Sequence, residues 1–469
     1  MMRASLAAPL VALALSGCNA GPDTVPTVSD VAVPDSFLLA PEAAPADAAA
    51  VAALLPDDPA FDTLAAAALA DAPTLAQALA RIDVARSGAD RAGARRLPDI
   101  GYDATLTASR TNLNLPPEVP FDTEQVQYAG NLVAGWDPDL FGALRNAERA
   151  ALLRVDAAGA QAAAVRLALL ADIAGAVTDW RTLGARQQAL EADRDGAQRL
   201  ADLSRTREEA GIAPGFDRFR AEAQAAQSIS RLAALDRERA DLLGRLVALT
   251  ALPAGEVAAA LAQSSPPDTL APPPPALPST LIAARPDIQA AALTLAAADA
   301  DLAAVAARRF PRLDLSGALG LLAFSVGGLF DTDALVGSAR SGLTGPLLDF
   351  GRIAAEIDEG EARTVLAFEE YRGAVFGAFG EVEGAYALVA AADAEAAATR
   401  REAEMATRAA TLADTRYRAG LENFLTVLEA RRAADTSGDR AAAARGRAVR
   451  ARILLWQALG GSAPADVES

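Results

Sequence analysis

The chain contains a tandem duplication of one unit, with a period of 209 residues. Residues 207–212 read Arg-Glu-Glu-Ala-Gly-Ile, and residues 416–421 read Arg-Tyr-Arg-Ala-Gly-Leu. Two more pairs keep nearly the same separation: Ala-Arg-Arg-Leu-Pro-Asp-Ile at 94–100 with Ala-Arg-Arg-Phe-Pro-Arg-Leu at 307–313, and Phe-Gly at 141–142 with Phe-Gly at 350–351. Because a solenoid repeat is typically about 20–50 residues long, we expect two copies of one large structural unit instead.

The N-terminus is typical of a bacterial secretory signal. Arg3 is basic, residues 6–15 are apolar, and Leu-Ser-Gly-Cys at 15–18 matches the lipobox, in which the cysteine is acylated and becomes the first residue of the mature chain. Cys18 is the only cysteine, so the chain forms no intrachain disulfide. Asn19 favours sorting to the outer membrane, because Asp at this position resembles the inner-membrane retention signal. The alternative is an ordinary signal peptide with an incidental cysteine.

Composition excludes several classes of function. A net charge of −18 argues against nucleic acid as a partner. Histidine is absent and only Met405 remains among the methionines after processing, so imidazole and thioether metal ligands are missing, as is catalysis by histidine. We expect the mature chain to contain no apolar run long enough for a transmembrane helix. We therefore expect no metal, no cofactor apart from the lipid on Cys18, and no enzymatic activity.

The repeated motifs, which we call landmarks, and the composition divide the chain into six parts. Each repeat has the same predicted order of a helix, two strands and two long helices. The parts are a signal peptide (1–17), an extended segment that begins at the lipidated cysteine (18–70), the first repeat (71–263), a Pro-rich linker (264–284), the second repeat (285–462) and a tail (463–469).

Apolar residues at heptad spacing predict long coiled-coil helices. In the second repeat one helix is expected from about Ile353 to Arg416, roughly 95 Å long. Its predicted seam is Phe368, Tyr371, Val375, Ala378, Val382, Ala385, Val389, Ala392, Ala396, Thr399, Ala403, Ala406, Ala410 and Ala413. The seam of the first repeat, interrupted by a glycine and an arginine, is Leu152, Val155, Gly159, Ala162, Arg166, Leu169, Ile173, Ala176, Trp180 and Leu183. Helices of this length form a rod or the wall of a tube.

Four short segments alternate between apolar and polar residues, as membrane β-barrel strands do. They lie at about 102–109, 126–136, 313–321 and 338–348, and the last shows the weakest alternation. A soluble antiparallel sheet with one wet face would also fit the pattern. However, four strands cannot close a barrel, and an open edge cannot face lipid. In an outer membrane such a chain must pool its strands with other copies.

The chain resembles the TolC-like outer membrane efflux channels, in the lipoprotein branch that serves resistance–nodulation–division (RND) pumps. The residues that carry the resemblance are Trp136-Asp137-Pro138-Asp139-Leu140-Phe141-Gly142, Ala284-Arg285-Pro286-Asp287-Ile288, Arg309-Phe310-Pro311, Leu348-Asp349-Phe350-Gly351-Arg352, Tyr417-Arg418-Ala419-Gly420, Val427-Leu428-Glu429-Ala430-Arg431-Arg432 and Leu459-Gly460-Gly461. The resemblance implies an α+β membrane protein: a trimeric twelve-stranded β-barrel, with four strands per protomer, continued by a long α-helical coiled-coil barrel. It also implies a periplasmic adaptor and an inner-membrane RND pump as partners, and a passive duct for drugs or other small molecules.

The resemblance assigns roles to two sets of residues. The hairpin tips, with Gly211 and Gly420 at the turns and Arg207, Arg416 and Tyr417 beside them, would contact the adaptor. Independently of that role, we expect both glycines to be left-handed helix caps, and arginine in a last turn also offsets the helix dipole.

The narrowest constriction of the family falls on Leu425 and Glu429, four residues apart and so on one helix face. Three-fold symmetry would make Glu429 a ring of carboxylates that selects for cations. The chain departs from the family at two positions. It has Glu429 where the family has Asp, and Thr426 where some members have a second Asp. A solvated surface glutamate on a coiled coil is the alternative.

Three other functions remain open. A channel for type I protein secretion fits the fold, although the lipobox argues against it. A heavy-metal efflux channel is disfavoured by the near absence of Met and His. A lipid-anchored periplasmic coiled-coil scaffold explains the helices but leaves the duplicated strand pairs unexplained.

Overall fold

The computed structural model describes residues 26–41, 48–110, 124–212, 214–265, 270–276 and 285–461. They form two compact units. The first unit consists mainly of residues 81–159 and 290–372, and the second of residues 32–80, 160–289 and 373–461. Cys18, the predicted lipid attachment site, lies outside the described residues.

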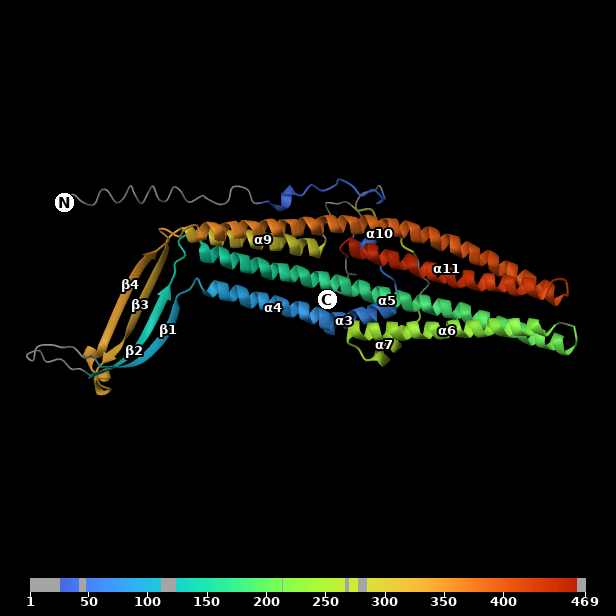
Figure 1. Cartoon of the computed structure of the whole chain (residues 1–469), viewed down its shortest axis with the longest axis horizontal. Coiled ribbons are helices and arrows are strands. Elements are labelled where there is room, and N and C mark those ends of the chain that lie inside the picture. Colours follow the sequence, from blue (N-terminus) through green and yellow to red (C-terminus); the bar gives the residue numbers. More distant parts are fainter. Residues whose placement is uncertain are drawn as a thin grey trace, which may run out of the picture. The chain divides into compact units, whose positions relative to one another are not determined.

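The same order of elements occurs twice along the chain (Figure 1). The first copy contains α4 (Pro73–Ala94), β1 (Asp99–Arg110), β2 (Glu124–Trp136), α5 (Ala143–Glu209) and α6 (Gly215–Thr250). The second copy contains α9 (Pro286–Ala306), β3 (Arg312–Ala323), β4 (Leu335–Thr344), α10 (Arg352–Arg418) and α11 (Phe424–Ala458). This is the helix, two strands and two long helices that the landmarks predict.

The four strands form one antiparallel sheet in the order β1-β2-β3-β4. The β2–β3 pair joins the two repeats, although a long stretch of chain separates these strands. Within this sheet β1 and β4 each keep one edge without a partner strand. An open edge leaves a row of backbone N–H and C=O groups unpaired, so the sheet is complete only when other strands join it.

The register of the sheet separates apolar from polar side chains. Tyr102 is opposite Leu132, which is opposite Leu319, and the three are 85%, 60% and 57% exposed. Asp103 and Asn131 point to the other face, where the Asn131 amide donates a hydrogen bond of 3.2 Å to the Asp103 carboxylate. A surface of large exposed apolar side chains is what lipid contact requires. The apolar/polar alternation predicted for a barrel is therefore present in the folded sheet.

The fourth strand differs from the prediction in its bounds. It begins at Leu335 and ends at Thr344, whereas we expected residues 338–348. Pro346 follows two residues after the strand; it lacks an N–H and has a fixed φ, so it cannot continue the ladder. Leu347 and Leu348 therefore lie in the next loop, where both are exposed.

Two helices of 67 residues, α5 and α10, dominate the helical part. Every residue of the seam predicted for α10 is buried or half-buried, and Val375, Val382 and Val389 are almost fully so. In α5 the predicted seam is also covered, with one correction. Leu152 is exposed, because Ala150 and Ala157 occupy the buried stripe in that part of the helix.

The repeated Phe-Gly pairs begin the two long helices. Gly142 and Gly351 have φ of 77° and 89°, a conformation that glycine adopts without strain. The carboxylates of Asp139 and Asp349 accept hydrogen bonds of 2.9 Å from the backbone N–H groups of Leu144 and Ile353, respectively. These bonds satisfy donors that a helix leaves free at its start. The Asp and Phe-Gly landmarks are thus start signals for α5 and α10.

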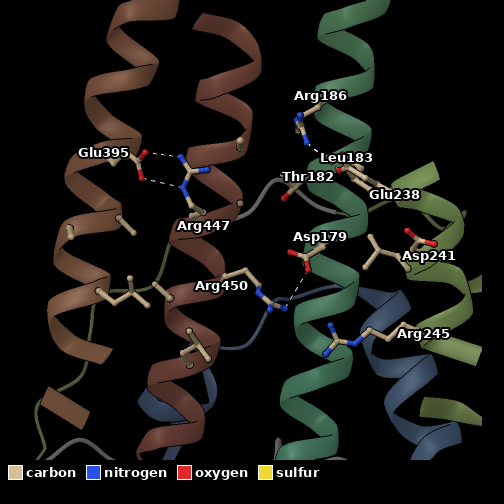
Figure 2. A pocket seen from close by; sticks show the side chains of 18 residues that line it. Asp179, Thr182, Leu183, Arg186, Glu238, Asp241, Arg245, Glu395, Arg447 and Arg450 are labelled. Atoms are coloured by element: carbon tan, nitrogen blue, oxygen red, sulfur yellow. Dashed lines mark hydrogen bonds and ion pairs between the residues drawn. The ribbon is translucent and has the colours of Figure 1, made fainter. Parts of the chain in front are cut away.

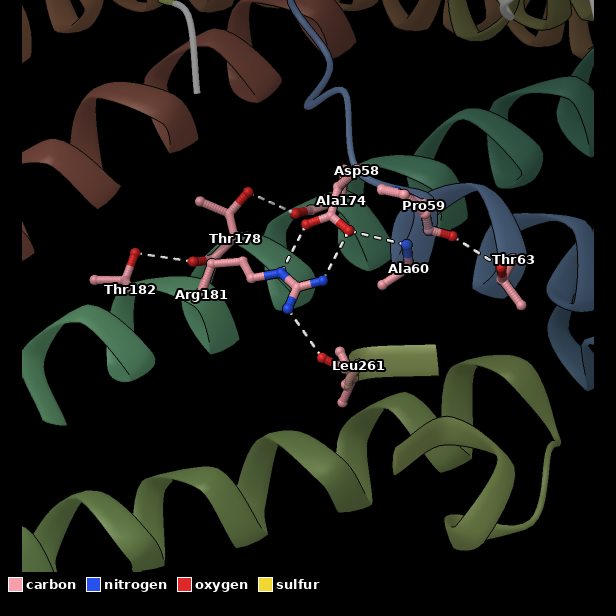
Figure 3. Close-up of polar contacts among 9 residues, drawn as sticks. All are labelled: Asp58, Pro59, Ala60, Thr63, Ala174, Thr178, Arg181, Thr182 and Leu261. Carbon is pink, nitrogen blue, oxygen red and sulfur yellow. Dashed lines mark hydrogen bonds and ion pairs between the residues drawn. The ribbon is translucent and has the colours of Figure 1, made fainter. Parts of the chain in front are cut away.

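The segment 18–70 is not extended throughout, which corrects the prediction. It contains α3 (Pro59–Asp71), which begins at the N-cap Asp58 and has Pro at its first position. Phe61 and Leu64 of α3 are buried. Asp58 also accepts hydrogen bonds of 2.8 and 2.9 Å from the guanidinium of Arg181 on α5 (Figure 3). The sequence reasoning missed this helix because it weighed the Ala/Pro/Asp composition and overlooked the Asp-Pro start signal.

The prediction that no apolar run is long enough for a transmembrane helix was wrong. Helices α5, α10 and the α9 segment through Arg309 each contain a stretch long and apolar enough to cross a membrane by length and composition alone. Half or less of each stretch is buried within the chain. Alanine, which scores as apolar, fills these stretches because small residues let coiled-coil helices approach closely.

Candidate functional site at the hairpin tips and the start of helix α11

Both hairpins turn through the same backbone motif. At the end of α5, Ile212 N–H donates to the Arg207 carbonyl (2.8 Å) and Gly211 N–H to the Glu208 carbonyl (2.9 Å). At the end of α10, Leu421 N–H donates to the Arg416 carbonyl (2.8 Å) and Gly420 N–H to the Tyr417 carbonyl (3.0 Å). This bonding defines a Schellman cap with glycine at the left-handed position.

The two glycines have φ of 71° and 76°, and no atom lies where a Cβ would be built. Glycine is therefore needed at both positions for its left-handed backbone conformation, as predicted for Gly211 and Gly420. The matching position of Arg207 and Arg416 in the two caps extends the duplication from sequence to backbone hydrogen bonding.

The two tips of one chain contact each other through Tyr417. The Arg207 guanidinium lies 4.6 Å from the centre of the Tyr417 ring, within the range of a cation–π contact. Tyr417 also meets Phe424 edge to face, with ring centres 6.2 Å apart. Both rings belong to a buried cluster shared by both hairpins, which also contains Leu200, Ala201, Ala221, Ala413, Val427 and Leu428.

The structure corrects the role expected for Tyr417. Only 4% of this residue is exposed, so its ring packs the interior of the tip and offers little surface to a partner. Its apolar body and its place in the last turn of α10 explain this position, because the heptad seam of that helix continues from Ala413 to Tyr417.

Two apolar residues that the sequence reasoning missed are exposed at the tips. Ile212 and Leu421 directly follow the cap glycines and are 70% and 67% exposed. Arg416 is also exposed, 3.8 Å from Glu422 in a loose ion pair. The sequence contains a pattern from which these residues could have been predicted, since an apolar residue follows the cap glycine in both copies of the motif.

Helix α11 begins immediately after the second tip. The Asn423 side chain caps it by accepting a hydrogen bond of 2.9 Å from Thr426 N–H. Phe424, Val427 and Leu428 then point into the tip cluster. Leu425 and Glu429 lie on the opposite side of the helix and are both exposed. The structure brings the two predicted gate residues to one face, directed away from the core of their own chain.

A pair of carboxyl groups bridges α5 and α11 nearby. Asp193 is buried, accepts a hydrogen bond from the Ser228 hydroxyl, and is hydrogen-bonded to Asp435. Burial, together with the hydrogen bond and the charge of Asp193, raises the pKa of Asp435 to about 8, and the charges of Arg431 and Arg231 offset only part of this. No sequence pattern predicted this pair, because aspartates on charged helices are usually solvated.

The sequence model of the family described as "Outer membrane efflux protein" matches residues 64–252 and 277–461. The chain belongs to the outer membrane efflux protein family. The two matched stretches correspond to the two copies of the repeat, so the family's own unit is the duplicated one seen in the sequence and the sheet.

Curated and solved members of the family are similar over most of their length. The pyoverdine export outer membrane protein OpmQ of Pseudomonas aeruginosa is 30% identical over 416 residues, which cover 87% of this chain and 86% of OpmQ. A crystal structure of a membrane protein from Pseudomonas aeruginosa, 28% identical, covers 93% of this chain and is itself covered completely, with a TM-score of 0.84. The Vibrio cholerae outer membrane protein VceC, 27% identical, covers 86% of this chain, is itself 96% covered, and has a TM-score of 0.79.

These similarities establish an efflux protein of the outer membrane. They confirm the family and the fold class, a mostly helical chain with one four-stranded sheet. They leave the roles of the gate and tip residues, and of Cys18, as predictions.

Proposed function

We propose that the chain is the homotrimeric exit duct of a tripartite RND-type efflux system, anchored by a lipid on Cys18. The observation that carries this proposal is the sheet: it has four strands, two free edges, one face of exposed apolar side chains and one polar face. Three such sheets supply the twelve strands of a small closed barrel. In this assembly the duct carries out no chemistry on its cargo.

Leu425 and Glu429 form the gate in this proposal. Both are exposed on the side of α11 that points away from the packed core of the tip. Across a three-fold axis the leucines would form an apolar plug, and one turn further on the glutamates would form a ring of carboxylates. Such a ring favours cations over anions.

The adaptor binds at the tips, through Arg207, Arg416 and the backbone around Gly211 and Gly420. The exposed Ile212 and Leu421 support this assignment, because two apolar side chains at matching positions give a docking partner two equivalent anchors. The pump contributes the energy, and cargo leaves passively through the duct. Cargo of small molecules is favoured over protein, since OpmQ is named for the export of pyoverdine.

Planar-bilayer recordings of Glu429→Lys test the gate. Reversal of the ring charge should shift the reversal potential in a salt gradient from cation preference towards anion preference. Glu429→Ala should weaken cation preference, and Glu429→Ala combined with Leu425→Ala should raise conductance. Val382→Ala, in the buried seam of α10, is the control and should leave selectivity unchanged. If Glu429→Lys conducts with wild-type selectivity, the carboxylate does not line the constriction.

The lipid anchor has a separate test. Mass spectrometry of the mature protein should find Cys18 as the N-terminal residue, carrying acyl chains. Cys18→Ser should abolish acylation while trimers still insert in part, because the strands span the membrane without the anchor. A mature N-terminus at another residue, without lipid, would refute the anchor and leave the duct untouched.

A further inference from the structure

A groove of about 790 Å³ lies between α5, α6, α10 and α11 in the second unit (Figure 2). Its floor is apolar and is formed by one leucine from each of the four helices, with alanines between them: Leu183, Leu242, Leu388 and Leu454. Charged side chains surround this floor. The volume lies within the range of about 300–1,000 Å³ found for small-molecule sites.

The groove lies on the same face of α11 as the gate residues. Arg447 and Leu454 line the groove, 18 and 25 residues after Glu429. These separations are close to five and seven turns of about 3.6 residues, so all three side chains project from one side of the helix. If Glu429 faces the lumen, the groove opens into the lumen roughly 27 Å or more beyond the gate.

Carboxylates hold the arginines of the groove in place. Arg447 makes two hydrogen bonds to Glu395, of 2.7 and 3.2 Å, and Arg450 reaches across from α11 to Asp179 on α5, at 3.5 Å (Figure 2). Carboxylates just outside the lining bind the other two: Asp439 binds Arg186 at 2.7 Å and Asp172 binds Arg245 at 2.6 Å.

In the part of the chain that the structure describes, the arginines of the groove are all paired, whereas one carboxylate is not. The lining holds four arginines and four carboxylates, Asp179, Glu238, Asp241 and Glu395, and the two aspartates just outside it bind two of the arginines. Asp241 is exposed at the rim and takes part in no ion pair recorded among the described residues. A ligand's cationic group would therefore find a carboxylate that no arginine already occupies.

We infer that this groove is a luminal binding site for amphipathic organic cations, with the apolar body of the ligand on the four leucines and its cationic group at Asp241. The inference rests on the proposed function, because only a lumen-facing gate places the groove in the path of cargo. In a trimer three such grooves surround the axis, so cargo that has passed the gate meets a weak site before it moves on.

Equilibrium binding of rhodamine 6G, a fluorescent hydrophobic cation, tests the inference on the trimer in nanodiscs. Fluorescence polarisation should show saturable binding to the wild type. Asp241→Asn should weaken it roughly threefold to tenfold, and Leu388→Gln by a similar factor, through the lost charge and the lost apolar contact, respectively. Asp236→Asn on α6 and Leu412→Gln on α10 are matched controls, exposed and outside the groove, and should bind like the wild type.

The inference is overturned if the wild type shows no saturable binding, or if the two groove variants bind rhodamine 6G as tightly as the controls. Fluorescein, an anion of similar shape, should bind much more weakly, and equal binding of both dyes would contradict the cation preference. If only the inference about the groove is wrong, the protein still forms a conducting trimer. Failure of the proposed function appears instead as the absence of a conducting trimer.

Discussion

Asp58 joins three helices that are far apart in the sequence. It caps α3, binds Arg181 of α5 through both carboxylate oxygens, and Arg181 in turn donates a hydrogen bond of 2.9 Å to the Leu261 carbonyl at the end of α7 (Ala254–Leu261). Burial raises the pKa of Asp58, but the hydrogen bonds from Arg181 and Ala60 N–H and the charge of Arg181 outweigh it. The pKa therefore lies below its ordinary value of 3.8.

Asp58→Ala should destabilise the second unit by roughly 2–4 kcal/mol, because it leaves the Arg181 guanidinium without its buried partner. Thermal denaturation followed by circular dichroism measures the effect as a lower Tm. Since folding lowers this pKa, the pair stabilises the fold fully above about pH 4, and its contribution is lost as the pH falls through the folded value.

The difference in Tm between wild type and Asp58→Ala should accordingly shrink below about pH 4. Asp83→Ala is the control, since it removes a carboxylate that is 74% exposed and paired with Arg86 on the same helix. Equal effects of the two substitutions at neutral pH would show that the Asp58–Arg181 pair does not hold α3 in place.

Single residues were predictable where local backbone rules decide them. Gly211 and Gly420 follow an arginine-containing last turn, and glycine is the usual residue at a left-handed cap. Tyr417 was wrongly predicted to be a surface residue that contacts the adaptor, because the sequence cannot show that the neighbouring hairpin buries its ring. The pairing of Asp193 with Asp435 was missed because it depends on two helices meeting far apart in the chain.

At the scale of elements, periodicity located the long helices and the strands. The heptad seam of α10 follows its buried stripe closely, since one side of a coiled-coil helix must be covered along its whole length. Short elements were less predictable. Helix α3 was not predicted, because its segment has the Ala/Pro/Asp-rich composition of an extended region. The bounds of β4 depend on its pairing with β3, which the weak alternation of its sequence does not reveal.

The Asp193–Asp435 bridge predicts a pH dependence of the contact between α5 and α11. Folding raises the pKa of Asp435 from 3.8 to about 8, so the folded state holds a proton that the unfolded state releases. The contribution of Asp435 to stability is therefore fully present below its unfolded pKa of 3.8 and is lost as the pH rises towards and through about 8. The Tm of the wild type should drop by several degrees between about pH 6 and pH 9.

Asp435→Asn should remove most of this drop, because the amide keeps a hydrogen bond to Asp193 without adding a second charge. Arg431 and Arg231, the cations that face the pair, remain in place in this variant. The exposed Asp236→Asn serves as control and should keep the wild-type dependence. A drop in Asp435→Asn as large as in the wild type would show that other groups titrate.

At the scale of the whole molecule, the free edges of the sheet determine what the chain must do. One chain supplies four strands, with exposed Tyr102, Leu132 and Leu319 on one face, and no described part of the same chain pairs with the edges of β1 and β4. The number of strands and the need for other copies followed from sequence. The number of copies came from the family resemblance, because nothing within one chain counts its neighbours.

Native mass spectrometry of the protein extracted from outer membranes tests the central claim most directly. We predict a single assembly of three chains that persists in detergent, because separation would expose two sheet edges and an apolar face on every protomer. A stable monomer, or any other copy number, would contradict the pooled twelve-stranded barrel and the duct built from it.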